Sequence, residues 1–132
     1  MTNYCSVLVV DDDAMTRARL VSVFSGAGYH VLSACSAAQA LLVQRVEPCD
    51  IVVTDWEMPD MDGPSLCRTL KSRDRDHRAY VMLLTVRRLE ADIIAALGAG
   101  ADDYLVKGIS IEEMLSRMEV GRRVTRSESA DH

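Results

Sequence analysis

Acidic side chains gather at two places in the chain where they could help to hold a cation. Asp11, Asp12 and Asp13 directly follow one short apolar run, and Asp55 directly follows another. Two carboxylates about 4 Å apart repel each other by about 4 kcal/mol at an effective dielectric constant near 20. If the fold brings these acids together, the site therefore needs a positive charge that they share.

Thr85 and Lys107 follow two further apolar runs and complete the set of candidate reactive groups. A hard cation such as Mg²⁺, or Mn²⁺ in its place, is typically held by one or two carboxylates plus a phosphoryl oxygen. Lys107 can supply the positive charge beside the carboxylates when no phosphate is present. An aspartate beside a metal ion and a lysine can form an acyl phosphate, to which Thr85 can donate a hydrogen bond. The predicted chemistry is phosphoryl transfer to an aspartate.

These groups need a scaffold, and the apolar pattern predicts one. In three of five short apolar runs, apolar and polar residues do not alternate, as expected for strands covered on both faces. The second and fifth runs contain more polar residues, which suits strands at the sheet edges. Between the runs, apolar residues recur three or four apart, which predicts helices. Five such strand–helix repeats predict a parallel sheet with helices on both faces. The predicted strands are 7–10, 30–33, 51–54, 80–84 and 103–106.

Helix start and stop signals support this assignment. Ser36 with Gln39, and Ser110 with Glu113, have the spacing of capping boxes, and Pro64 suits a first helical turn. Helices are expected to stop at glycines. The glycines at such positions are Gly26, Gly28, Gly98 and Gly100.

Bulk composition narrows the function further. The chain has 132 residues, 48% of them hydrophobic, and a net charge of −5, which argues against direct binding of nucleic acid. No signal peptide and no apolar stretch of about 20 residues is visible, so no membrane segment is expected. The cysteines show no close pairing, which predicts reduced thiols in a cytoplasmic protein. They are Cys5, Cys35, Cys49 and Cys67.

Four motifs together resemble the receiver domain of response regulators, as in two-component signalling proteins of the chemotaxis-regulator kind. They are Leu-Val-Val-Asp-Asp-Asp at 8–13, Asp-Trp-Glu-Met-Pro-Asp-Met-Asp-Gly at 55–63, Leu-Leu-Thr at 83–85, and Gly-Ala-Asp-Asp-Tyr-Leu-Val-Lys at 100–107. The resemblance covers about residues 6 to 120. It implies a single doubly wound α/β domain of flavodoxin-like topology, with a five-stranded parallel sheet in the order 2-1-3-4-5.

The same resemblance assigns roles to the acidic residues. Asp55 would accept the phosphoryl group from a sensor histidine kinase or a phosphotransfer protein. Asp11 and Asp12 would serve the metal ion, with Asp12 and Asp55 as direct ligands. Glu57 would contribute its backbone carbonyl to the same ion.

It also implies how the signal leaves the site. Thr85 and Lys107 would contact the phosphoryl group. Tyr104 would change rotamer together with Thr85, which alters the face formed by the fourth helix, the fifth strand and the fifth helix. An output protein or domain would bind that face.

Two positions depart from the family pattern. Gly108 stands where a proline in a cis peptide usually follows the lysine, so the sequence leaves the isomer of the Lys107–Gly108 peptide open. Val86 stands where a smaller residue is usual, and we expect its branched side chain to narrow access to Asp55. Glu57 and Arg87 flank the site. An ion pair between them is expected to hinder the water molecule that would attack the phosphorylated Asp55 and hydrolyse it.

Several neighbouring residues have simpler explanations. Asp13 is expected to be a helix N-cap, and Asp60 and Asp62 to be solvated loop residues. Trp56 either lies half-exposed beside the site or packs in the interior.

The predicted function is a phosphorylation-operated interaction module and not a turnover enzyme. Residues 1–120 form the receiver, and 121–132 a polar tail or the start of a connector to a missing output domain, such as a diguanylate cyclase or a phosphatase. A metal-dependent aspartyl phosphohydrolase is a less favoured alternative, because Asp55 follows the third strand and no substrate cap fits in the length. A flavin-binding electron carrier is rejected. Its first loop would be rich in Ser, Thr and Gly to bind phosphate, whereas the loop at 11–13 is Asp-Asp-Asp.

Overall fold

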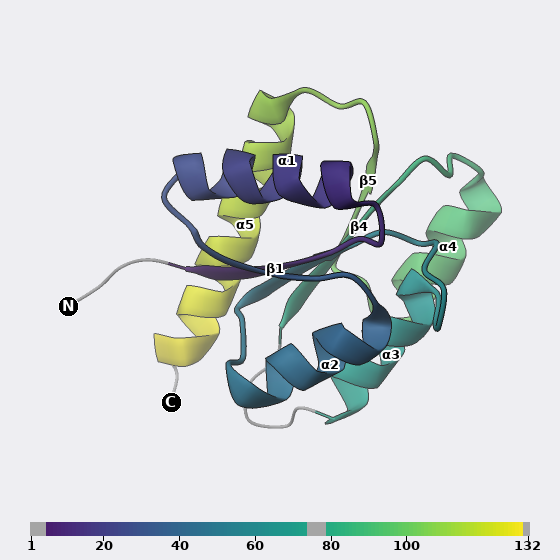
Figure 1. The fold of residues 1–132 in the computed structure, drawn as a ribbon, viewed down its shortest axis with the longest axis horizontal. Helices are drawn as coiled ribbons and strands as arrows, with labels where there is room; N and C mark the ends of the chain where they lie inside the picture. The colour runs from purple at the N-terminus through teal and green to yellow at the C-terminus, as the bar shows by residue number, and fades with distance from the viewer. Residues whose placement is uncertain (1–4, 74–78, 131–132) are drawn as a thin grey trace.

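Strands and helices alternate along the whole of the described chain. The computed structural model describes residues 5–73 and 79–130 (Figure 1). The strands are β1 Ser6–Val10, β2 His30–Ala34, β3 Ile51–Thr54, β4 Tyr80–Thr85 and β5 Asp103–Val106. The helices are α1 Ala14–Gly26, α2 Ala37–Val46, α3 Gly63–Arg73, α4 Glu90–Gly98 and α5 Ile111–Ala130. Each predicted strand is present. Thr85 is the last residue of β4, whereas the sequence placed Thr85 directly after the end of this strand.

The five strands form one parallel sheet in the predicted order, β2-β1-β3-β4-β5. The inner strands β3 and β4 are buried throughout, whereas the edge strands β2 and β5 are only partly buried. Successive strand residues face opposite sides of a sheet, so Val7 and Val9 pack in one core with α1 and α5. Leu8 and Val10 pack in the other core with α2, α3 and α4, and Figure 1 shows these two layers of helices. The α/β prediction is confirmed.

Polar caps begin three of the helices as the sequence predicted. The carboxylate of Asp13 accepts the Thr16 N–H, and the hydroxyls of Ser36 and Ser110 accept the N–H of the residue three positions later. Gly28 and Gly100 have φ near +98° and +106°, which explains why glycine ends α1 and α4.

The prediction for Asp60 and Asp62 was incomplete. Both side chains are exposed, but each binds the start of a helix. Asp60 accepts the N–H groups of Ala37 and Ala38 at 3.1 and 2.8 Å, and Asp62 accepts that of Ser65 at 2.8 Å. The loop after β3 is therefore tied to both α2 and α3. The sequence missed the first tie because Asp60 lies 22 residues or more from its partners.

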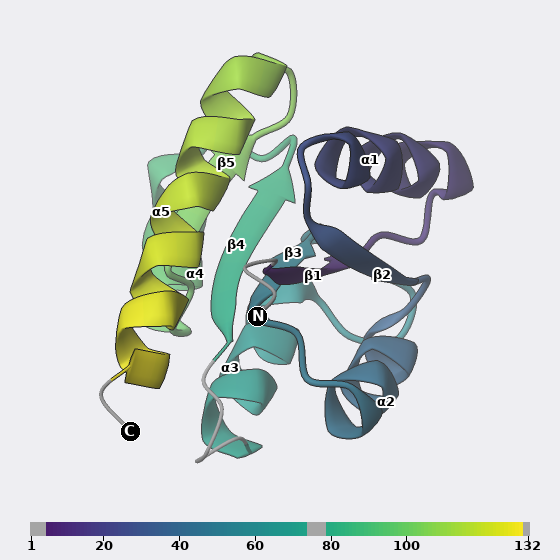
Figure 2. The same cartoon turned by 90° about the vertical axis from the view of Figure 1, so that its left-hand side faces the viewer.

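Helix α5 continues without a break past residue 120 (Figure 2). Thr125 is buried, and a β-carbon built on Gly121 would lie 2.7 Å from a ring carbon of Tyr80. The helix therefore packs on the sheet for at least another turn beyond the boundary that the sequence suggested. Residues 131 and 132 of the predicted tail lie outside the described residues. None of the described helices combines the length and the apolar character that crossing a bilayer requires.

The close approach at Gly121 predicts that Gly121→Ala destabilises the domain. Overpacking against the buried Tyr80 ring costs about 1–3 kcal/mol, and the better helix propensity of alanine returns about 1 kcal/mol. We expect a net loss of up to about 2 kcal/mol in urea unfolding. Gly98→Ala is the matched control, because a β-carbon added at Gly98 would meet nothing within 4 Å. Equal stability of the two variants would contradict the tight packing of α5.

Candidate functional site

Parallel strands bring distant residues to one edge of the sheet. Val10 of β1 pairs in register with Thr54 of β3, so Asp11 and Asp55, the next residues along, emerge side by side. The Asp55 N–H donates to the Val10 carbonyl at 3.1 Å, and the Asp11 N–H donates to the Ala34 carbonyl at 3.2 Å. Both aspartates are therefore fixed by the sheet itself.

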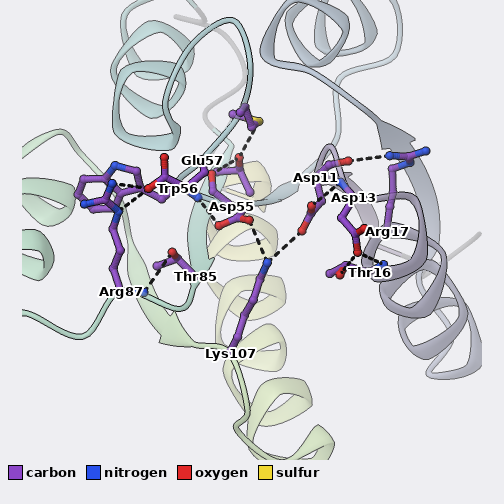
Figure 3. Close-up of polar contacts among 12 residues, drawn as sticks. Asp11, Asp13, Thr16, Arg17, Asp55, Trp56, Glu57, Thr85, Arg87 and Lys107 are labelled. Carbon is purple, nitrogen blue, oxygen red and sulfur yellow. Dashed lines mark hydrogen bonds and ion pairs between the residues drawn. The ribbon is translucent and has the colours of Figure 1, made fainter.

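Lys107 lies between the two carboxylates (Figure 3). Its Nζ is 2.9 Å from Asp55 Oδ2 and 3.3 Å from Asp11 Oδ2. Burial acts to lower the pKa of Lys107, but the hydrogen bond and charge of Asp55, together with those of Asp11, outweigh it and raise the pKa above its usual value. Asp11 is 2% exposed. A single ammonium ion thus contacts two carboxylates, one of them buried, and leaves one negative charge uncompensated.

The remaining carboxylate oxygens are held by backbone N–H groups. Asp11 Oδ1 accepts the Asp13 N–H at 2.9 Å, and Asp55 Oδ1 accepts the Trp56 N–H at 2.6 Å. Each carboxylate is bound at both oxygens, so the pair is preorganised in orientation as well as in position.

The predicted gathering of three acids is only partly correct. The structure brings Asp11 and Asp55 together, but the Asp12 side chain is exposed, and no group of three His, Cys, Asp or Glu side chains converges on a common point within residues 5–73 and 79–130.

The donor set nevertheless fits a divalent cation. Two carboxylates with hard oxygen donors face one positive charge at this edge, and a third acidic side chain follows Asp11 directly in the chain. Oxygen ligands of this kind are those that Mg²⁺ prefers.

Thr85 and Tyr104 both bind the backbone of Arg87. Thr85 is fully buried, and its Oγ1 accepts the Arg87 N–H at 3.4 Å. The hydroxyl of the half-buried Tyr104 donates to the Arg87 carbonyl at 2.9 Å. The two residues predicted to move together therefore contact one and the same residue.

The predicted ion pair between Glu57 and Arg87 is present. Arg87 Nε lies 2.9 Å from Glu57 Oε1, which Nη2 also contacts. The guanidinium lies over the Trp56 ring, 4.5 Å from its centroid, and Trp56 is 9% exposed. Of the two possibilities for Trp56, packing is therefore correct. Val86, by contrast, is 67% exposed.

The peptide after Lys107 is trans, since no cis bond occurs among the described residues. Gly108 has a φ of +106°, a conformation that glycine adopts without steric cost. The residue after Lys107 therefore adopts a backbone conformation that favours glycine.

Sequence reasoning missed two residues that shape the site, Arg17 and Gly63. Arg17 Nη1 donates to the Asp11 carbonyl at 2.7 Å and so steadies the acidic loop. The sequence carries no signal for this contact, because it joins a helix side chain to a loop carbonyl six residues earlier. A β-carbon on Gly63 would clash with the Asp55 carbonyl oxygen. Only glycine therefore allows the start of α3 to approach Asp55 this closely.

Comparisons with known proteins agree with this geometry. A family model described as the response regulator receiver domain matches residues 7–119. The response regulator MprA of Mycobacterium bovis (strain BCG / Pasteur 1173P2) is 40% identical over 124 residues, which are 94% of this chain and 53% of that protein. The chain thus spans about half the length of the curated relatives it matches.

Solved structures show the same fold. A CheY-like receiver domain protein from Methanospirillum hungatei JF-1 superposes with a TM-score of 0.86 at 22% identity, covering 95% of this chain and 98% of that one. The receiver domain of the Francisella response regulator 1452 gives 0.84 at 30% identity, covering 92% and 98%. With the family match over most of its length, the chain belongs to the response regulator receiver domains of two-component signalling.

Proposed function

We propose that this domain is a phosphorylation-activated switch that accepts a phosphoryl group on Asp55 from a sensor histidine kinase or a phosphotransfer protein. The observation that carries the proposal is the Lys107 ammonium shared by Asp55 and the buried Asp11. A cation at this place can neutralise a phosphoryl group as well as it neutralises a carboxylate. The domain is a regulatory phosphoacceptor and not an enzyme with turnover on other substrates.

The proposed transfer forms one bond and breaks one. A carboxylate oxygen of Asp55 attacks the phosphorus, and the phosphorus–nitrogen bond to the donor histidine breaks. Lys107 then pairs with a phosphoryl oxygen, and the Thr85 hydroxyl donates to another. Lys107 and Thr85 are thus the groups that we assign to the phosphoryl group itself.

Mg²⁺, or Mn²⁺ in its place, would supply the further positive charge that the transferred group requires. Asp11, Asp12 and Asp55 would hold the ion with their side chains, and Glu57 with its backbone carbonyl. The exposed Asp12 can turn toward an ion that enters from solvent, whereas Asp11 and Asp55 are already fixed.

Output would pass through the face formed by α4, β5 and α5. Tyr104 lies in β5 and bonds to the segment between β4 and α4, so a change at Thr85 can reach this face. The binding partner would be a separate protein or an output domain beyond residues 1–120, for example a diguanylate cyclase or a phosphatase. The four cysteines, all of them among the described residues, form no disulfide, which accords with the cytoplasmic location that we propose.

Phosphorylation of Asp55 gives the direct test. Incubation with Mg²⁺ and a small phosphodonor such as acetyl phosphate should add the mass of one phosphoryl group in intact-protein mass spectrometry. Asp55→Asn should abolish the addition, because an amide is not a competent nucleophile here. Asp60→Asn is the control, since Asp60 caps α2 and should leave the addition intact. Phosphorylation that persists in Asp55→Asn would refute the assignment.

Mg²⁺ binding should raise the thermal stability of the domain. By mass action, a concentration 100 times the dissociation constant adds about 2.7 kcal/mol. Asp12→Ala should weaken this response and, by removing an acidic neighbour, slightly stabilise the metal-free fold. NaCl at matched ionic strength is the control in differential scanning calorimetry. An unchanged Mg²⁺ response in Asp12→Ala would remove Asp12 from the metal site.

Val86 provides a test of access to Asp55. We propose that this branched side chain, directly after Thr85, narrows the approach of small donors. Val86→Ala should speed phosphorylation by acetyl phosphate by about two- to ten-fold, the effect of up to about 1.4 kcal/mol on a barrier. Stopped-flow Trp56 fluorescence measures the rate. The same rate in both proteins would show that the exposed side chain does not restrict the approach.

A further inference from the structure

The Arg87 side chain joins the segment after Asp55 to helix α4. Its guanidinium covers the Trp56 ring and binds Glu57, and these two residues directly follow Asp55. On its other side, Nη1 lies 3.6 Å from Asp92 Oδ1, in the first turn of α4. The side chain therefore connects helix α4 to a segment that lies 30 residues before Arg87 in sequence.

The Arg87 backbone joins the two predicted switch residues. Its N–H donates to the Thr85 hydroxyl oxygen, and its carbonyl accepts from the Tyr104 hydroxyl. Arg87 is thus bonded through its backbone to the groups that must move, and through its side chain to the groups that flank Asp55. Figure 3 shows the cluster of Trp56, Glu57, Thr85 and Arg87 beside Asp55.

These contacts oppose the movement that phosphorylation requires. For the Thr85 hydroxyl to turn toward a phosphoryl group, its bond with the Arg87 N–H must lengthen or break. For Tyr104 to move with it, the bond to the Arg87 carbonyl must break as well. The contacts of the guanidinium with Trp56, Glu57 and Asp92 restrain the backbone of residue 87 from following either group.

We propose that Arg87 is a latch that holds the segment between β4 and α4 in its resting arrangement, so that the domain switches only when phosphorylation overcomes these contacts. The inference rests on the proposed function and adds its regulation. The latch differs from the predicted hindrance of the attacking water. It concerns the equilibrium between the resting and the switched arrangement of the domain, and not the rate at which phosphorylated Asp55 is hydrolysed.

Removal of the latch should make the switched state easier to reach. Exposed ion pairs and cation–π contacts each change an equilibrium by a few-fold. The apparent affinity of a ligand that selects the switched state rises in proportion to the population of that state. Arg87→Ala should therefore lower the apparent dissociation constant for beryllofluoride, a phosphoryl mimic, by about three- to ten-fold.

The experiment is a beryllofluoride titration of the whole protein at saturating Mg²⁺, followed by the emission of Trp56, the single tryptophan. Arg88→Ala is the matched control, because Arg88 is the exposed neighbour and its loss changes the charge equally. Asp92→Asn provides a second variant that removes one partner of the latch from α4 and leaves the sheet edge intact. It should shift the affinity in the same direction by a smaller factor. Amide hydrogen exchange in α4, without any ligand, should be faster in Arg87→Ala than in Arg88→Ala.

Equal or weaker beryllofluoride binding by Arg87→Ala, relative to Arg88→Ala, would overturn the latch, and weaker binding would place Arg87 among the groups that hold the phosphoryl group. If the unaltered protein does not respond to beryllofluoride at all, the proposed function fails, while the exchange rates in α4 still test the latch. Beryllofluoride does not report hydrolysis, so the lifetime of phosphorylated Asp55 separately measures any effect of Glu57 and Arg87 on the attacking water.

Discussion

The interaction on which the site depends is the placement of one ammonium ion between two carboxylates. Asp11 is 2% exposed, and a buried charge is tolerated only when it is paired and hydrogen-bonded. Lys107 and the Asp13 N–H meet that requirement. Loss of one partner of a buried ion pair typically costs about 3–5 kcal/mol. The resting domain therefore already contains the ion pairs that a metal ion and a phosphoryl group would rearrange.

The parallel sheet makes this balance possible. Its three contributing strands end at the same edge, so residues 52 or more positions from Lys107 in sequence meet at hydrogen-bonding distance. The parallel register of β1, β3 and β4 aligns these strand ends. Gly63 keeps α3 close to the Asp55 carbonyl, which a larger residue would displace. Fold and site are thus two aspects of one packing arrangement.

Around this centre, two arginines connect the acidic residues to the helices. Arg17 binds the Asp11 carbonyl from α1, where it steadies the loop that carries the acids. Arg87 binds the residues after Asp55 and reaches α4. The Arg17 contact preserves the geometry of the site. The Arg87 contacts connect the site to α4, which is part of the face where a partner would bind. Arg17 uses one nitrogen for its contact, whereas Arg87 uses both Nε and Nη2 of the guanidinium to bind Glu57.

Local chemistry in the sequence determined the strands, the helix caps and the reactive residues. Non-alternating apolar runs imply strands covered on both faces, and Asp13, Ser36 and Ser110 cap helices through neighbours three positions away. The tertiary structure alone decided which acids meet. Asp12 is adjacent to Asp11 in sequence, yet only Asp11 turns inward to share Lys107 with Asp55. Such long-range contacts depend on which strands lie side by side and in what register, which no local pattern encodes.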